Sequence, residues 1–282
     1  MRFYYQGQIL EDHPMASLDN RGLFYGDGLF ESIHVVHGRA LYLEQHWMRL
    51  MSSMRILRME IPNEFTLAFL QDTLSKLFIA DPDQAPRYRA RITVWRQSGG
   101  LYTPTTNDVN YFISIDKVQG EVFTTAPGAR EVELFKDHYQ GSSLISRLKT
   151  NNKLINVLAG IYADENGYQD MLLLNEKKEV TEAIGGNLFV VHGHEIITPP
   201  LESGCLRGVM RNELRKQLVN MPEYDFAERS ISPFELQRAD EIFTTNVIQG
   251  IRPITKFRKK VYDSKISDQL QKKMRTLALL GA

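Results

Sequence analysis

Two residues in the middle of the chain could do covalent chemistry together. Lys149 stands just ahead of a predicted helix, and Glu182 ends the strand-like segment Val180–Glu182. A lysine amine forms an imine with an aldehyde, and a carboxylate keeps a neighbouring ring nitrogen protonated. These are the two protein groups that make pyridoxal phosphate an electron sink. Taken alone, Lys149 would be an exposed helix start and Glu182 a surface charge, so the interpretation depends on the surrounding pattern.

A phosphate site is expected further along the chain. Gly208 follows the segment Ser203–Arg207 and precedes a helix predicted from about Val209 to Leu218. The free backbone N–H groups of a helix start bind phosphate, and a glycine lets the phosphate approach closely. The second half of the chain therefore offers groups for both ends of pyridoxal phosphate.

Composition indicates an ordinary soluble protein and argues against a nucleic-acid binder. The 282 residues are 43% apolar and 24% charged, with 34 basic and 34 acidic side chains. Such a balance lacks the positive footprint of nucleic-acid recognition. The basic cluster at 256–260 is expected to be a solvated surface.

Neither a membrane span nor a metal site is expected. No apolar run reaches the roughly 18 residues that cross a bilayer, and the chain does not begin like a signal peptide. Cys205 is the single cysteine and cannot form an internal disulfide, which fits a reducing compartment. A cytoplasmic location is therefore expected, with no nucleophilic role for Cys205. None of the seven histidines has metal-ligand spacing.

The first half has the pattern of an α+β unit. Alternating apolar positions predict strands over 2–10 and over 29–43, the latter turned at His37-Gly38, with further strands at Arg89–Trp95 and Tyr111–Ile115. Apolar residues at helical spacing predict a helix over 43–54 and a second helix after a cap at Asn63.

The second half predicts a helix flanked by short strands. A strand near Glu131–Phe135 leads to Lys149 at the entry of this helix, which ends at Gly167. Its predicted apolar stripe consists of Leu154, Val157, Leu158, Ile161 and Tyr162. Short strands at 171–174, 179–181, 187–191 and 195–197 indicate a curled, barrel-like sheet rather than a doubly wound parallel one.

The length of the chain favours two domains. Gly and Pro punctuate residues 120–127, and no periodicity continues through them. We expect a small N-terminal α/β domain over 1–119, a linker over 120–127 and a larger C-terminal domain over 128–282.

A set of short motifs, in this order, resembles the fold-type IV family of pyridoxal-phosphate enzymes. The motifs are Asn20-Arg21-Gly22, Tyr25-Gly26-Asp27-Gly28-Leu29-Phe30-Glu31, Leu43-Glu44-Gln45-His46 with Arg49-Leu50, Leu148-Lys149, Asn156-Val157-Leu158-Ala159, Val180-Thr181-Glu182 with Asn187-Leu188-Phe189, Thr198-Pro199-Pro200-Leu201, Gly208-Val209-Met210-Arg211 and Ala239-Asp240-Glu241-Ile242-Phe243. The family includes D-amino-acid aminotransferases, branched-chain aminotransferases and aminodeoxychorismate lyase. The resemblance covers nearly the whole chain and implies an α+β fold of two domains.

The resemblance also implies a role for each matching residue. Lys149 is the lysine that forms the imine, and Glu182 pairs with the pyridine nitrogen. Arg49 binds the phosphate as a fixed fork of donors, and Leu206 packs against the ring. Backbone N–H groups that meet the phosphate come from Val209, Met210, Asn246 and Val247. A homodimer is implied as well, with segment 20–30 near the border of the site.

The choice of reaction follows from weaker signals. Transaminases of the family often carry threonines in the two phosphate loops, where this chain has Met210 and Val247. Aminodeoxychorismate lyases resemble it in Gly-hydrophobic-Met-Arg, in an asparagine like Asn246 and in the loop over 96–102, although that loop is a residue shorter and lacks an arginine. Phe30 stands where D-amino-acid aminotransferases commonly have tyrosine.

The first expectation is therefore a lyase that converts 4-amino-4-deoxychorismate to 4-aminobenzoate and pyruvate for folate synthesis. An aminotransferase acting on branched-chain or D-amino acids is the alternative, and a homologue that binds the cofactor without catalysis is a minor one. Arg91, Arg96 and Arg252 are the candidate cations for substrate carboxylates, each equally suited to a structural ion pair; Tyr102 and Phe30 are further candidates.

Overall fold

The computed structural model describes residues 2–5, 7–10, 19–81, 85–124 and 128–280. By compactness the chain divides into two units, Met1–Gly120 with Lys149–Asn152, and Glu121–Leu148 with Lys153–Ala282. The linker predicted over 120–127 stays a prediction, and residues 125–127 lie outside the described residues. No pattern in the sequence predicted that residues 149–152 belong with the first unit.

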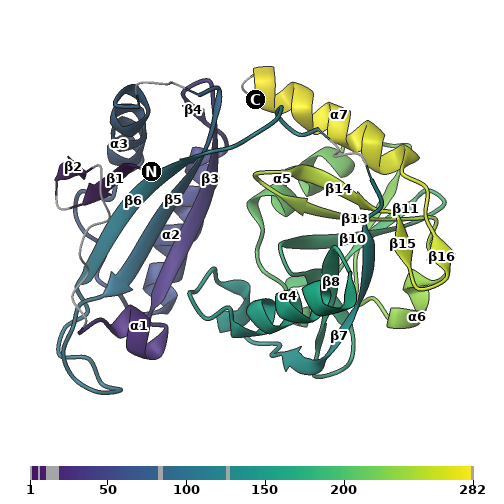
Figure 1. Ribbon diagram of the computed structural model, residues 1–282, viewed down its shortest axis with the longest axis horizontal. Helices are drawn as coiled ribbons and strands as arrows, with labels where there is room; N and C mark the ends of the chain where they lie inside the picture. The colour runs from purple at the N-terminus through teal and green to yellow at the C-terminus, as the bar shows by residue number, and fades with distance from the viewer. Residues whose placement is uncertain (1, 6, 11–18, 82–84, 125–127, 281–282) are drawn as a thin grey trace. The chain divides into compact units, whose positions relative to one another are not determined.

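The first unit is a sheet with two of its helices on one face (Figure 1). Its elements are β1 (Arg2–Tyr5), β2 (Gln8–Leu10), α1 (Arg21–Tyr25), β3 (Gly28–Val36), β4 (Arg39–Ala40), α2 (Leu43–Ile56), α3 (Leu67–Ile79), β5 (Arg87–Arg96) and β6 (Val109–Lys117). All described strand pairs are antiparallel, in the order β2-β1-β6-β5-β3-β4.

Strand register decides which side chains face the helices. Glu31, Ile92, Ile113 and Tyr4 are cross-strand neighbours and so share one face. Glu31 contacts α2 and Tyr4 contacts α3, so both helices cover that face. Phe30, Thr93 and Phe112 alternate with these residues and lie on the opposite face.

One helix boundary differs from the prediction. Helix α3 is capped by Thr66, whose hydroxyl accepts a hydrogen bond from the Phe69 N–H at 3.1 Å, and not by Asn63. Phe65 precedes the cap and packs edge-on against Tyr111, with ring centres 4.4 Å apart. The apolar residue that suggested an earlier start therefore belongs to a turn that packs on the sheet.

The second unit is built on a mixed sheet. Its elements are β7 (Glu131–Gln140), the 3₁₀ turn η1 (Ile145–Arg147), α4 (Leu154–Asn166), β8 (Asp170–Asn175), β9 (Val180–Ala183), β10 (Gly186–His192), β11 (Glu195–Thr198), the 3₁₀ turn η2 (Leu201–Ser203), α5 (Val209–Leu218), β12 (Asp225–Glu228), α6 (Pro233–Leu236), β13 (Glu241–Asn246), β14 (Gly250–Ile254), β15 (Lys256–Phe257), β16 (Lys260–Val261) and α7 (Lys265–Leu280). Parallel pairs join β7 to β8, β7 to β15 and β11 to β12; the other described pairs are antiparallel.

Strand β10 is the branch point of this sheet. It pairs with β13 along 187–191, with β9 at its beginning and with β11 at its end. Since β13 occupies one edge, β9 and β11 divide the other edge between them. The sheet is therefore curled rather than doubly wound, and the predicted α+β fold class is confirmed.

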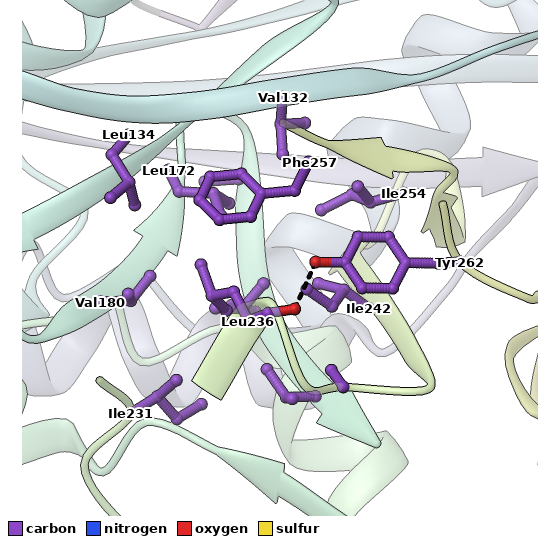
Figure 2. Packing of buried hydrophobic residues seen from close by; sticks show 14 of the residues in the cluster. Val132, Leu134, Leu172, Val180, Ile231, Leu236, Ile242, Ile254, Phe257 and Tyr262 are labelled. Atoms are coloured by element: carbon purple, nitrogen blue, oxygen red, sulfur yellow. Dashed lines mark hydrogen bonds between the residues drawn. The ribbon is translucent and has the colours of Figure 1, made fainter. Parts of the chain in front are cut away.

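An apolar core fills one side of this sheet (Figure 2). Val132, Leu172 and Ile254 surround the fully buried Phe257. The hydroxyl of Tyr262 donates to the Leu236 carbonyl oxygen, which satisfies the polar end of an otherwise apolar cluster.

Helix α4 buries a different face from the predicted one. Ala159 and Ala163 are its fully buried residues, joined by the partly buried Ile155, Leu158 and Tyr162. By contrast, Leu154, Val157 and Ile161 are 70%, 54% and 49% exposed, respectively. The helix is apolar on nearly all sides, so its periodicity alone did not select the buried face. Gly167 ends the helix at φ 74°, as predicted.

Candidate active site

Lys149 is held beside a strand and not at a helix start. The Phe30 N–H donates to the Lys149 carbonyl oxygen at 2.9 Å, and the Asn151 N–H donates to the Gly28 carbonyl oxygen at 3.0 Å. Leu29 and Thr150 form the antiparallel bridge between these bonds. The segment therefore adds a short extended piece to the edge of β3. Helix α4 begins only at Leu154, which corrects the predicted position of Lys149.

The Phe30 ring is shared by two cations. The Lys149 Nζ lies 4.3 Å from the ring centre, and the Arg91 Cζ lies 4.1 Å from it. Arg91 Nε also donates to Thr93 Oγ1 at 3.1 Å. Burial lowers the pKa of Arg91. Strand register explains the grouping, because Lys149 is opposite Phe30 across the bridge and Arg91 and Thr93 share the Phe30 face.

A buried ion pair fixes Arg49. Its Nε donates to Glu31 Oε1 at 2.7 Å and its Nη2 to Glu31 Oε2 at 2.5 Å. His46 Nδ1 lies 2.7 Å from the same Oε2. Burial raises the pKa of Glu31, but the Arg49 guanidinium and the His46 ring more than offset this and lower it to about 2. Burial lowers the pKa of His46. This bidentate geometry sets the plane of the guanidinium.

In the second unit, Glu182 lies in a network of donors. Gln140 Nε2 donates to its Oε1 at 3.1 Å, and the Leu206 N–H donates to its Oε2 at 2.9 Å. Asn187 Nδ2 approaches Oε2 at 3.4 Å. Thr181 Oγ1 in turn donates to Gln140 Oε1 at 3.0 Å, which fixes the direction of that amide. Hydrogen bonds from three groups favour the ionised carboxylate.

The predicted helix over 209–218 is confirmed as α5. Gly208 is its N-cap residue and supplies no side-chain hydrogen bond. The first N–H groups of a helix, here those of Val209 and Met210, have no partner within the helix. Leu206 lies two residues before the cap and is half-buried. An uncapped helix start is a site for an anion, and its dipole favours one.

Asn246 closes the turn between β13 and β14. Its Oδ1 accepts hydrogen bonds from the N–H groups of Ile248 at 3.0 Å and Gln249 at 2.8 Å. Its Nδ2 donates to the Gly185 carbonyl oxygen at 3.0 Å. Val247 lies within the same turn and is buried. The side chain of Asn246 therefore shapes the loop whose N–H groups, by the family resemblance, are expected to bind phosphate.

The structure gives a reason not to propose two of the candidate arginines, Arg96 and Arg252, as substrate residues. Arg96 is buried and donates to Asp27, to Asn107 and to the carbonyl oxygens of 57 and 58, so the fold uses four of its five N–H groups. Arg252 pairs across strands with Thr244, whereas Glu182 belongs to the alternate face of the sheet. Neither is retained as a proposed substrate residue.

Tyr102 is 90% exposed within the first unit. Its ring centre lies 5.8 Å from that of Tyr25. Arg21 Nη1 donates to the Gly99, Gly100 and Leu101 carbonyl oxygens and anchors the loop. Contact of Tyr102 with substrate stays a prediction.

Several residues beside the predicted groups had no assigned role. Glu31, His46 and Asn187 occurred in the family motifs but carried no function in the sequence interpretation. Gln140 ends β7, far from Glu182 in sequence, and no local pattern pointed to it. Register across the curled sheet, which the sequence does not fix, brings it to the carboxylate.

Other chemistry has no support in the described part of the chain. No group of three or more metal-binding side chains lies together among the described residues. No described helix is long and apolar enough to cross a membrane. Cys205 is buried, and burial, with the nearby Glu182, raises the pKa of its thiol to about 12. A thiol in that environment is a weak nucleophile.

Comparison with known proteins gives a consistent family and varied activities. The family model for amino-transferase class IV matches residues 28–257. A D-alanine aminotransferase of Bacillus licheniformis is 26% identical over 270 residues, which cover 90% of this chain and 88% of that protein. An aminodeoxychorismate lyase of Bacillus subtilis is 25% identical over 266 residues, covering 93% and 88%.

The fold has an equally clear match. A branched-chain aminotransferase from Thermoproteus uzoniensis superposes with a TM-score of 0.89 at 22% identity, over 99% of this chain and 95% of that one.

Proposed function

This chain belongs to the amino-transferase class IV family and is a pyridoxal-phosphate enzyme, and we propose that it acts on a small amine that carries a carboxylate. The family resemblance inferred from the motifs is thereby confirmed, and the reaction is the open question. The observation that carries the cofactor assignment is the set of three donors around Glu182.

The residues present fit the cofactor. The uncapped start of α5 has N–H groups for a phosphate, and Gly208 has no side chain in the way. Glu182 is suited to hold a proton on a ring nitrogen, because its donors stabilise the negative charge. When bound, pyridoxal phosphate supplies an aldehyde for exchange with an amine and a ring that accepts electron density.

Lys149 performs the proton transfer in this proposal. Its backbone is fixed by the bridge to β3, and its side chain lies over the Phe30 ring. A fixed backbone limits where the amine can reach, and a positioned base is what proton transfer requires. Arg91 lies on the same ring, so the Nζ and the guanidinium carbon are at most about 8.4 Å apart, the sum of their distances to the ring centre. We assign Arg91 to a substrate carboxylate, which its fork of donors suits.

The favoured reaction is the lyase reaction on 4-amino-4-deoxychorismate. Lys149 removes the ring proton and the C–O bond of the enolpyruvyl ether breaks. The enolpyruvate that leaves takes up a proton and becomes pyruvate, and the ring product is 4-aminobenzoate. The two products contain all the atoms of the substrate, so no second substrate is consumed. Support comes from the apolar Met210 and Val247 at the loop positions where transaminases often carry threonine.

An aminotransferase of branched-chain or D-amino acids is the second candidate. It is favoured by the similarity to the D-alanine aminotransferase. The two reactions differ in stoichiometry, since transamination consumes a keto acid and the lyase reaction does not.

The deciding experiment supplies the purified protein and pyridoxal phosphate with 4-amino-4-deoxychorismate and no keto acid. Equal amounts of pyruvate and 4-aminobenzoate are expected. Bound cofactor without these products, together with keto-acid-dependent loss of an amino acid, would replace the lyase by the aminotransferase. Bound cofactor with neither reaction would favour the non-catalytic homologue.

A homodimer is proposed as well. The exposed apolar face of α4, formed by Leu154, Val157 and Ile161, is of the kind that protein contacts cover. Light scattering should give twice the chain mass for the wild type. Ile161→Glu should shift this towards one chain, whereas Asn166→Lys, on a different side of the same helix, should not; a wild-type monomer contradicts the proposal. The cytoplasmic location remains a prediction for cell fractionation.

A further inference from the structure

Asn187 lies between the two groups of the second unit that the proposed function assigns to the cofactor. Its Nδ2 donates to the Leu206 carbonyl oxygen at 2.8 Å and approaches Glu182 Oε2 at 3.4 Å. The Leu206 N–H donates to the same Glu182 oxygen at 2.9 Å. One buried amide therefore contacts both the carboxylate and the loop that leads into α5.

The amide oxygen of Asn187 explains why residue 208 is a glycine. A Cβ built on Gly208 would lie 1.9 Å from Asn187 Oδ1 and 3.1 Å from its Cγ. The φ of Gly208 is −69°, which any residue adopts, so space and not backbone conformation requires glycine here. Asn187 is only 3% exposed and its Nδ2 is engaged, which restricts its movement away from a new methyl group.

Strand register places these contacts on one face of the sheet. Glu182, Asn187 and Thr245 are successive cross-strand neighbours on β9, β10 and β13. Thr245 Oγ1 is buried and has no hydrogen-bond partner among the described residues. Buried polar groups in folded proteins are rarely left without a hydrogen-bond partner. The unpaired hydroxyl beside Glu182 and Asn187 is therefore unusual for a sheet face with a purely structural role.

We propose that Asn187 is a positioning residue that couples the Glu182 carboxylate to the phosphate-binding start of α5. The inference rests on the proposed function and extends it, because neither the motifs nor the family match assigned Asn187 a role. A displacement of this amide moves Leu206, and Leu206 is bonded to Glu182 and lies two residues before the helix cap. Removing the amide therefore weakens binding at both ends of the cofactor.

The test measures binding at the two ends of the cofactor separately by using fragments of pyridoxal phosphate. Calorimetry measures the dissociation constants of pyridoxal phosphate, of pyridoxal, which lacks the phosphate, and of inorganic phosphate. Asn187→Ser and Asn187→Ala are compared with Thr198→Val, which removes another buried hydrogen bond of the same sheet, from Thr198 Oγ1 to the Leu188 carbonyl oxygen at 2.7 Å. Thermal unfolding confirms that each protein is folded at the temperature used.

Both Asn187 variants should bind each fragment about tenfold more weakly, and Thr198→Val should bind as the wild type does. Weakening of only one fragment, or equal weakening in Thr198→Val, would overturn the coupling. A wild type that binds no pyridoxal phosphate overturns the proposed function itself, which is a different result.

A second measurement tests the contact between Asn187 and residue 208 directly and begins from a protein in which Asn187 is intact. Gly208→Ala should weaken pyridoxal phosphate binding about tenfold in the wild type, because the new methyl group meets Asn187 Oδ1. In the Asn187→Ala background that oxygen is gone, so adding Gly208→Ala should cost much less. If the losses of binding free energy from the two substitutions simply add, the contact between residue 208 and Asn187 is not the cause of the weaker binding.

Discussion

Lys149 and Phe30 are joined through both backbone and side chain. The Phe30 N–H donates to the Lys149 carbonyl oxygen at 2.9 Å, and the Lys149 Nζ lies 4.3 Å from the centre of the Phe30 ring. The backbone bond fixes where the lysine starts, and the ring attracts the ammonium group at its end. Together they account for a lysine with a defined direction in a segment that is neither helix nor long strand.

Loss of the ring should leave the fold intact and misplace the amine. Phe30→Ala is expected to slow attachment of pyridoxal phosphate to Lys149 about tenfold, since cation–π contacts contribute about 0.5–2 kcal/mol. Phe30→Tyr keeps an aromatic face and should stay near the wild-type rate. Stopped-flow absorbance measures both, and an unchanged rate in Phe30→Ala would show that the ring does not position Lys149.

The buried ion pair between Glu31 and Arg49 should contribute strongly to stability. Glu31→Gln removes the carboxylate that pairs with the buried Arg49 guanidinium, which costs roughly 3–5 kcal/mol of unfolding free energy. Asp72→Asn breaks the exposed pair with Lys76, whose side chains are 59% and 61% exposed, and should cost less than about 1 kcal/mol. Urea unfolding compares the two; similar losses would argue against a special role for the buried pair.

Acid sensitivity should begin with His46. Burial lowers its pKa below the usual 6.5, so the unfolded chain takes up a proton that the folded chain resists. The free energy of unfolding that this ring contributes is present above pH 6.5 and is lost as the pH falls below that value. Glu31, with its pKa lowered to about 2, loses its contribution only between pH 4.5 and about 2.

His46→Gln provides the check, because glutamine donates to Glu31 and does not titrate. Urea unfolding at a series of pH values should show a shallower decline between pH 6.5 and 5 in the variant than in the wild type. Parallel curves would mean that His46 is not the source of the acid sensitivity.

Arg91 should affect substrate binding more than the folded structure. Arg91→Gln keeps a polar side chain but removes the charge, so KM for a carboxylate-bearing substrate should rise about tenfold or more. Arg89→Gln is a control on the same strand, because Arg89 is half exposed and pairs with Asp116 at 3.1 Å. Steady-state kinetics distinguish the two, and equal effects would remove Arg91 from the proposed site.

Local signals predicted local structure well. The helix predicted after Gly208 has the bounds of α5, and the predicted helix end at Gly167 is the end of α4. The sequence did not predict which chain segments pack against strands distant in the sequence. The sequence could not show that Lys149 joins the edge of β3, because that pairing spans more than one hundred residues.

The same limit applies to the candidate site. An arginine looks alike in sequence whether it faces substrate or a carboxylate of the fold. Only the hydrogen bond to Asp27 in the folded chain assigned Arg96 to the second case. The apolar stripe of α4 was displaced by one position because almost every face of that helix is apolar. The motifs in the sequence therefore indicated the family, whereas tertiary contacts decided which side chains lie together.

The absorbance spectrum of the protein with pyridoxal phosphate tests the central claim most directly. The wild type should show a visible band from cofactor attached to a lysine. Lys149→Ala should lose it, while Lys153→Ala, at the start of α4, should keep it. A band that persists in Lys149→Ala and disappears in Lys153→Ala, or is absent from the wild type, would contradict the assignment of Lys149.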